Sequence, residues 1–200
     1  MNIIDISREL MSADVYPGDP EPRIQKYEQI AEGDDCNLSA LYLCLHNGTH
    51  IDAPNHFIDG GATAESLELD RFIGECTVIE VPEGAIHGAY IDENIPSDCE
   101  RLIIKGGGKA YFSDSGAFAL ASLGVKLVGT DSNSVGTHGA QLAPHRAFLG
   151  ADIPLLEGLN LTDVAPGKYF LIAPPLNING VEATPTRALL IEDYIFWSKK

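Results

Sequence analysis

The chain has 200 residues, a hydrophobic content of 44% and a net charge of −16, from 13 basic and 29 acidic residues. This length suits one domain, residues 1–200, with a sizeable core. The acidic balance makes nucleic acid an unfavourable partner, because phosphate backbones are repelled. No apolar run approaches the ~18 residues that cross a bilayer, and the N-terminus does not resemble a signal peptide. We therefore expect no membrane partner and a cytoplasmic protein.

Strands dominate the predicted elements. Apolar and β-branched residues indicate strands at 3–6, 23–30, 38–46, 76–81, 102–105, 126–130, 169–173 and 188–191. The stretch 38–46 is apolar on both faces, which predicts a central strand with Cys44 buried in it. Because no cysteines are spaced as CxxC, we expect free and mostly buried thiols rather than a disulfide scaffold.

Helical patterns are fewer. Residues 115–124 begin with Ser115 as a candidate cap and end at Gly124. A second helix is predicted at 143–150, with Pro144 in its first turn, and a short third at 65–72. This pattern predicts an α/β domain with a mixed, curled β-sheet and few helices.

Potential metal ligands are concentrated between the predicted strand at 38–46 and the segment that follows it. His46, His50, Asp52 and His56 lie within eleven residues, and all four are at even-numbered positions. Alternate residues share a face of an extended chain, and imidazole and carboxylate groups together suit a divalent metal. A set of hydrogen-bonded histidines without a metal is the alternative, which this density disfavours.

The spacing also constrains the backbone. A straight strand would place His46 and Asp52 roughly 20 Å apart, at about 3.3 Å per residue, too far for one ion. A helix would put His46 and His50 on one face, but Gly48 and Pro54 disfavour it. We therefore predict a buried strand running into a curled loop that presents the ligands.

The motif His46-x-Gly-Thr-His50-x-Asp52-x-Pro54-x-His56-Phe57 resembles the signature of the metal-dependent cyclase family, which includes bacterial kynurenine formamidases and isatin hydrolases. The resemblance extends along nearly the whole chain. Weaker matching segments are Asp5-Ile-Ser7, Tyr16-Pro-Gly-Asp-Pro20, the stretch from Gly124 to Asp131, Leu155-Leu-Glu157-Gly-Leu159 and Pro185-Thr-Arg187-Ala188.

The resemblance implies the cyclase-family fold, of swivelling β/α/β type, and a site with two divalent metal ions, Zn or Mn. His46, His50 and Asp52 would hold one ion, and Asp52 would bridge to the second. A downstream histidine and a glutamate twelve residues later would complete the site, and His145 and Glu157 have this spacing. His56 corresponds to the catalytic acid/base of the family.

The implied activity is hydrolysis of a small-molecule amide, namely N-formyl-L-kynurenine to L-kynurenine and formate. Kynurenine formamidases typically have tryptophan near the substrate where this chain has Tyr16, so Tyr16 is a candidate substrate contact. An isatin-like lactam, or another cyclic amide or ester, is an alternative substrate. A non-catalytic metal-binding protein is an alternative of another class, favoured if the site has four ligands and no open position. The resemblance also implies a homodimer or homotetramer.

Three other polar residues bear on these predictions. His87 lies in a turn-like stretch and is expected to be exposed, while His138 lies on the surface or at the edge of the pocket. Glu157 is flanked by leucines, which predicts a buried strand. A buried ion pair involving Arg187 and Asp131 is the rival to metal binding by Glu157.

Overall fold

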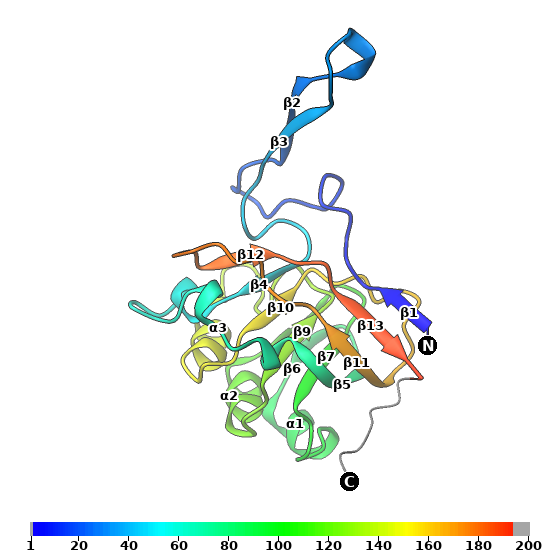
Figure 1. The fold of residues 1–200 in the computed structure, drawn as a ribbon. Helices are drawn as coiled ribbons and strands as arrows, with labels where there is room; N and C mark the ends of the chain where they lie inside the picture. The colour runs from blue at the N-terminus through cyan, green and yellow to red at the C-terminus, as the bar shows by residue number, and fades with distance from the viewer. Residues whose placement is uncertain (1, 194–200) are drawn as a thin grey trace.

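A nine-stranded sheet is the centre of the computed structural model, which describes residues 2–193 (Figure 1). Its strands are β1 (Asn2–Asp5), β13 (Leu189–Glu192), β11 (Gly167–Ile172), β5 (Ile73–Glu80), β7 (Arg101–Lys105), β9 (Leu127–Thr130), β10 (Leu155–Glu157), β4 (His50–Asp52) and β12 (Ala183–Pro185), in this order across the sheet. The pairs β5–β7, β7–β9 and β9–β10 are parallel, and the outer pairs are antiparallel. The predicted mixed, curled sheet is thus confirmed.

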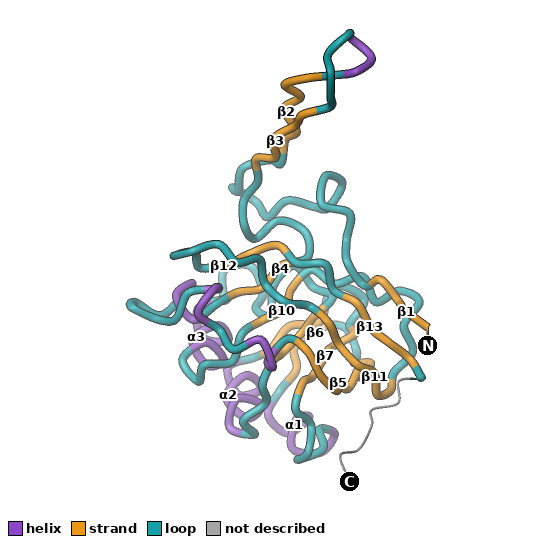
Figure 2. The backbone as a smooth tube through the Cα atoms, in the orientation of Figure 1, coloured by secondary structure: helices purple, strands orange, loops and turns teal. Residues whose placement is uncertain are grey.

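The sheet has an apolar core on each face, because its central strands are buried on both sides. Three α-helices cover one face: α1 (Gly88–Asn94), α2 (Asp114–Ser122) and α3 (Leu142–Leu149) (Figures 1 and 2). Phe148 and Leu149 of α3 pack there with Leu155 of β10. On the other face, Leu156 of β10 packs with Ile51 of β4. The short strands β4 and β10 are therefore fixed from both sides.

Two of the three predicted helices are confirmed within a few residues. The predicted helix at 115–124 is α2, but its cap is Ser113, whose Oγ accepts a hydrogen bond from the N–H of Gly116 at 3.2 Å. The prediction of Ser115 as the cap was wrong, because the sequence offers two serines at this boundary. The predicted helix at 143–150 is α3.

The remaining elements are short. The predicted helix at 65–72 consists of two 3-10 turns, Ala64–Ser66 and Leu69–Arg71. Two further 3-10 turns are Ile30–Glu32, before the motif, and Pro54–His56, within it. The strands β6 (Gly84–Ile86) and β8 (Ala110–Phe112) form a small parallel pair. In the described part of the chain, no helix is long and apolar enough to cross a membrane.

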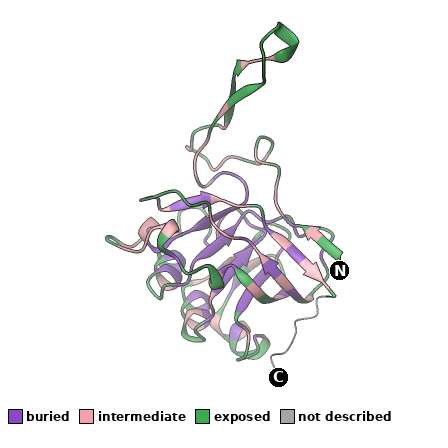
Figure 3. Ribbon diagram, in the orientation of Figure 1, coloured by how far each residue is buried: buried purple, intermediate pink, exposed green. Residues whose placement is uncertain are grey.

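A hairpin arm, defined as residues 21–44, projects from the body (Figure 1). It contains β2 (Arg23–Glu28) and β3 (Leu38–Tyr42), which pair only with each other in the described sheets. Leu38 and Leu41 are about half exposed, and the arm is coloured mostly as exposed in Figure 3. The prediction of a central strand at 38–46 was therefore wrong, since its apolar residues lie outside the core.

The cysteines follow the same correction. Cys44 lies beyond β3 and is half-buried, Cys36 is exposed, and Cys76 alone is fully buried among the four free thiols. The expectation of free thiols is confirmed, whereas the expectation that most are buried was wrong.

Candidate metal centre and its pocket

The motif residues converge at the strand pair β10–β4, next to the edge strand β12, although His46 lies in the loop before β4 rather than on a strand. His50 and Asp52 are the ends of β4, and His56 ends the 3-10 turn that begins at Pro54. The prediction placed a buried strand before the motif residues, but the buried strand here, β4, follows His46. The predicted curl is confirmed: Gly48, with φ of +67°, lies in the loop between His46 and β4.

The second half of the set comes from the helix-covered side. Glu157 ends β10, where its Cα is paired with that of His50 across the antiparallel ladder. His145 lies in α3, and Phe57 stacks on its ring with centroids 4.3 Å apart. His50, Asp52, His145 and Glu157 are each at most 3% exposed. The structure thus brings together all six residues that the sequence and the resemblance singled out for metal binding or acid/base catalysis.

Asp52 lies at the centre of this cluster. Its Oδ1 is 2.9 Å from Nδ1 of His46 and 3.3 Å from Nε2 of His50. Its Oδ2 is 3.8 Å from Nε2 of His145 and 4.0 Å from Nε2 of His56. Glu157 also lies close to two of these imidazoles. Its Oε2 is 3.6 Å from Nε2 of His50, and its Oε1 is 3.5 Å from Nε2 of His145. The Asp52 carboxylate therefore faces four histidines.

Backbone carbonyls orient two of the histidines. Nδ1 of His50 is 3.0 Å from the carbonyl oxygen of Gly48, and Nδ1 of His145 is 2.8 Å from that of Gln141. A carbonyl can only accept, so Nδ1 carries the proton in both rings, and Nε2 presents a lone pair to the cluster when the ring is neutral. This is the arrangement of histidine ligands in metal sites.

Several buried donors and acceptors have no hydrogen-bond partner. Both carboxylate oxygens of Asp52 and Nε2 of His50 are buried without an aligned partner. Such groups are costly unless something else satisfies them. Ligand atoms within 4.8 Å of one another form two groups, His46–Asp52–His56 and His50–Asp52–Glu157, which share Asp52. The chemistry of these donors fits a divalent metal.

Burial and charge shift the pKa values of the cluster in different directions. Burial lowers the pKa of His46, but the Asp52 carboxylate outweighs it and the net pKa is raised to about 9. The pKa values of His50 and His145 are also raised, against their burial, by Asp52 and Glu157. Burial raises the pKa of Asp52, but His46 and His50 hold it well below its usual range.

His56 differs from the other histidines. Burial and the neighbouring His46 and His145 lower its pKa, and the more distant Asp52 does not offset them. Its side chain is 28% exposed, compared with 2% for His50. It is therefore neutral near pH 7 and accessible, as a group that exchanges protons with a ligand must be.

A cavity of about 200 Å³ opens beside the cluster. Besides the histidines and Glu157, it is lined by Tyr16, Asp19, Phe57, Asn133, Ser134 and Gln141. Tyr16, the predicted substrate contact, is thus in the wall, and its hydroxyl is 2.7 Å from Nδ1 of His138. His138 is exposed and His87 is exposed as expected. The predicted surface position of His138 is confirmed, and its bond to Tyr16 places it at the rim.

Sequence reasoning assigned no role to four residues of this wall. Asp19 lies in the Tyr16-Pro-Gly-Asp segment that resembles the family, so the sequence did offer a signal for it. Gln141 is one helical turn before His145, a position from which its carbonyl can reach that ring. Asn133 and Ser134 lie in an irregular loop, and the sequence offers no signal for them.

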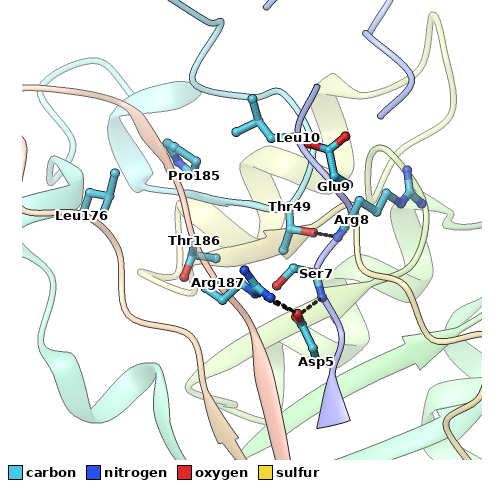
Figure 4. Close-up of a pocket in the computed structure, with 10 residues that line it drawn as sticks. All are labelled: Asp5, Ser7, Arg8, Glu9, Leu10, Thr49, Leu176, Pro185, Thr186 and Arg187. Atoms are coloured by element: carbon cyan, nitrogen blue, oxygen red, sulfur yellow. Dashed lines mark hydrogen bonds and ion pairs between the residues drawn. The ribbon is translucent and has the colours of Figure 1, made fainter. Parts of the chain in front are cut away.

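A second hollow, of about 450 Å³, is lined by Thr49 and by residues from both ends of the chain, among them Asp5 and Arg187 (Figure 4). There Nε of Arg187 donates to Oδ2 of Asp5 at 2.8 Å, and the N–H of Arg8 donates to Oγ1 of Thr49 at 2.9 Å. No histidine lines it among the described residues. The rival explanation for Glu157 was wrong, because Arg187 pairs with Asp5.

The remaining partner in that rival explanation is also engaged elsewhere. Both carboxylate oxygens of Asp131 accept from the N–H of Gly106, at 3.0 and 3.1 Å. Glu157 accepts instead from the N–H of Val135 at 2.7 Å. The predicted burial of Glu157 in a strand is confirmed.

Comparison with known proteins agrees with this geometry. The Cyclase family model, described as "Putative cyclase", matches residues 4–137. The kynurenine formamidase of Sphingopyxis alaskensis is 37% identical over 95% of this chain and 98% of its own. A solved structure described as a potential metal-dependent hydrolase with cyclase activity is 27% identical, with a TM-score of 0.82 over 94% of this chain and 96% of its own.

Isatin hydrolase A from Labrenzia aggregata shares the fold, with a TM-score of 0.77 and 19% identity over 94% of this chain and 93% of its own. The family model covers more than half of the chain, and the identity to a kynurenine formamidase extends over nearly all of both sequences. This chain belongs to the Cyclase family.

Proposed function

We propose that the chain is a metal-dependent amide hydrolase that converts N-formyl-L-kynurenine to L-kynurenine and formate, with residues 1–200 acting as one catalytic domain. The observation that carries the proposal is the pair of donor groups sharing the buried Asp52 beside an accessible cavity. The 37% identity to a kynurenine formamidase supports the substrate.

His46, His50, Asp52, His145 and Glu157 would hold two divalent ions, Zn or Mn, with Asp52 between them. The unpartnered oxygens of Asp52 and Nε2 of His50 support this assignment, because a metal would satisfy them. A bound divalent ion supplies hydroxide near neutral pH and polarises an amide carbonyl. Histidine and carboxylate donors suit both metals.

His56 is the proton-transfer group in this proposal. Its lowered pKa keeps it neutral near pH 7, so that its Nε2 can accept a proton from water. Hydrolysis adds the hydroxyl group of water to the formyl carbon and breaks the C–N bond. His56 then returns the proton to the leaving nitrogen, which departs as an aryl amine.

The cavity wall orients the substrate. Phe57 and Tyr16 offer aromatic surfaces for an aryl ring, and the bond between Tyr16 and His138 fixes one of them. The shared fold with isatin hydrolase A and the presence of Tyr16 where kynurenine formamidases typically have tryptophan favour a cyclic amide, such as a lactam, as the second candidate substrate. The cavity beside the donors favours catalysis over metal binding alone.

The test uses protein reconstituted with Zn or Mn. N-Formylkynurenine, isatin and a simple aryl ester are assayed in parallel with metal analysis, and we expect turnover of the formamide to be fastest. His56→Ala should retain metal and lose about 10²- to 10⁴-fold in kcat, whereas Asp52→Ala should lose both. His87→Ala is the matched control, since His87 is exposed and bonds to Ser113.

Full metal occupancy and activity in Asp52→Ala would contradict the assignment. Saturated metal without turnover of any of the three compounds would instead identify a metal-binding protein. Faster turnover of isatin than of the formamide would identify the lactam as the substrate.

We further propose that the protein assembles as a homodimer or homotetramer through the hairpin arm. A two-stranded hairpin is marginal in water on its own. This one exposes apolar and aromatic side chains from both strands and from the turn between them: Ile24, Tyr27, Ile30, Leu38, Leu41 and Tyr42. The 24 residues of the arm match the roughly 20–30 that one partner contributes to a standard interface.

A further inference from the structure

The charges that line the cavity beside the histidine cluster are all of one sign, apart from those of the histidines. Among the described residues, no lysine or arginine lines it, and its carboxylates are Glu157 and Asp19. Glu157 is buried and accepts from the N–H of Val135. Asp19 is therefore the lining carboxylate outside the cluster.

A tight turn fixes Asp19 in the wall. Its N–H donates to the carbonyl of Tyr16 at 3.0 Å, and Gly18 between them has a φ of +100°, a conformation that suits glycine. The aromatic ring of Tyr16 is in turn held by His138 at 2.7 Å. An aromatic surface and a carboxylate are thus presented together by one four-residue turn.

The carboxylate of Asp19 has a free oxygen. The thiol of Cys44 donates to its Oδ2 at 3.4 Å, which is the contact made to this side chain by the part of the chain that the structure describes. Asp19 is half-buried, so its Oδ1 is reachable by a ligand in the cavity. A thiol is a weak donor, and an ammonium group would be a much stronger partner.

We propose that Asp19 binds the ammonium group of an amino-acid substrate and so determines specificity. This inference rests on the proposed hydrolysis of an aryl formamide and names the feature that the site selects. The aryl ring would lie against the aromatic wall that includes Tyr16, and the α-ammonium group would donate to Oδ1 of Asp19. The absence of lysine and arginine from the described lining agrees, because neither side chain stands there to repel an ammonium group beside Asp19.

The experiment compares two substrates that differ in one group. N-Formyl-L-kynurenine is paired with its deamino analogue, which keeps the aryl formamide and the carboxylate but has hydrogen in place of the ammonium group. We expect the metal-loaded wild-type enzyme to favour the ammonium substrate in kcat/KM. A charge-assisted hydrogen bond predicts a preference of roughly 10- to 100-fold.

Asp19→Asn should abolish that preference. We expect kcat/KM for N-formyl-L-kynurenine to fall by roughly 10- to 100-fold while that for the deamino analogue changes by less than about twofold. Asp14→Asn is the matched control, an exposed carboxylate of the same segment that lines a different hollow. Melting temperature and metal content should be unchanged in both variants.

Equal turnover of both substrates by the wild type, or an equal loss on both in Asp19→Asn, would overturn the role of Asp19. Binding of L-kynurenine and its deamino form, measured by calorimetry, reports the same preference without turnover. A wild type that binds L-kynurenine more tightly but hydrolyses no formamide would contradict the proposed function and still support Asp19 as the ammonium site.

Discussion

Asp52 is the residue on which the chemistry of the cluster depends. It is fully buried, lies within 4.0 Å of four imidazoles and has no aligned hydrogen-bond donor. Protonated histidines can balance its charge when no metal is bound, which explains the raised pKa values of His46, His50 and His145. In the proposed site, the same side chains would exchange these protons for metal ions.

This exchange predicts a pH-dependent metal affinity. A ligating imidazole must be neutral, so a metal that binds His46 at pH 7 must displace the proton that its pKa of about 9 retains. We expect the apparent affinity to rise between pH 6.5 and 9, by about tenfold per pH unit for each proton released. Competition with a chelator across this range measures it, and an affinity independent of pH would contradict the prediction.

The stability of the metal-free protein should change in the opposite sense. The folded-state pKa of His46 lies above its unfolded value of about 6.5. The stabilisation of the folded state by protonated His46 is therefore fully present below pH 6.5 and is lost as the pH rises through about 9. Denaturant unfolding of the metal-free protein over this range accompanies the affinity measurement, and His46→Ala should flatten the dependence.

At the scale of elements, the site depends on the contact between β10 and the loop that enters β4. Gly158 directly follows Glu157 and has a φ of +68°, and a Cβ there would lie 2.2 Å from the carbonyl oxygen of Gly48. Thr49 donates its hydroxyl to the carbonyl of Gly158 at 2.6 Å. The backbone that follows Glu157 is thus in direct contact with the backbone that precedes His50.

Gly158→Ala should therefore separate β10 from β4. The clash is with backbone, so we expect destabilisation of at least about 3 kcal/mol and loss of metal as Glu157 moves away from His50. Gly180→Ala is the control, because Gly180 has a φ of +79° but open space around its Cβ position; strain alone predicts about 1 kcal/mol there. Denaturant unfolding and metal analysis distinguish the two, and equal effects would show that the contact is unimportant.

Features of the fold that depend on the spacing of neighbouring residues were predictable from the sequence. The spacing of the motif required a curl, and Gly48 in the loop before β4 confirms it. By contrast, the arm was predicted as a central strand, because apolar residues at 38–46 look the same whether they pack in a core or are displayed on a surface. The sequence also could not show that the N–H of Val135 holds Glu157, since this backbone contact is made by the tertiary fold.

At the scale of the whole molecule, the body and the arm have different surfaces. The arm contributes six of the fifteen exposed large hydrophobic residues of the described chain, although it is 24 residues long. Arg23 stacks over the ring of Tyr42 at 4.3 Å, and the hydroxyl of Tyr42 is 3.3 Å from that of Tyr27. Tyrosine and arginine beside apolar residues are typical of protein interfaces.

These features predict that disruption of the arm dissociates the protein. Ile24 and Leu41 face each other across the two strands on one side of the hairpin, so the double substitution Ile24→Asp/Leu41→Asp places two charges in the proposed interface. We expect the wild type to sediment as a dimer or tetramer and the variant as a monomer. Phe118→Asp is the control, because Phe118 is 72% exposed on α2, outside the arm.

A wild type that is monomeric at micromolar concentration, or a variant that keeps the wild-type mass, would contradict the proposed assembly. Since the arm lies outside the core, the variant should retain its melting transition if it folds as a monomer, and this separates dissociation from unfolding.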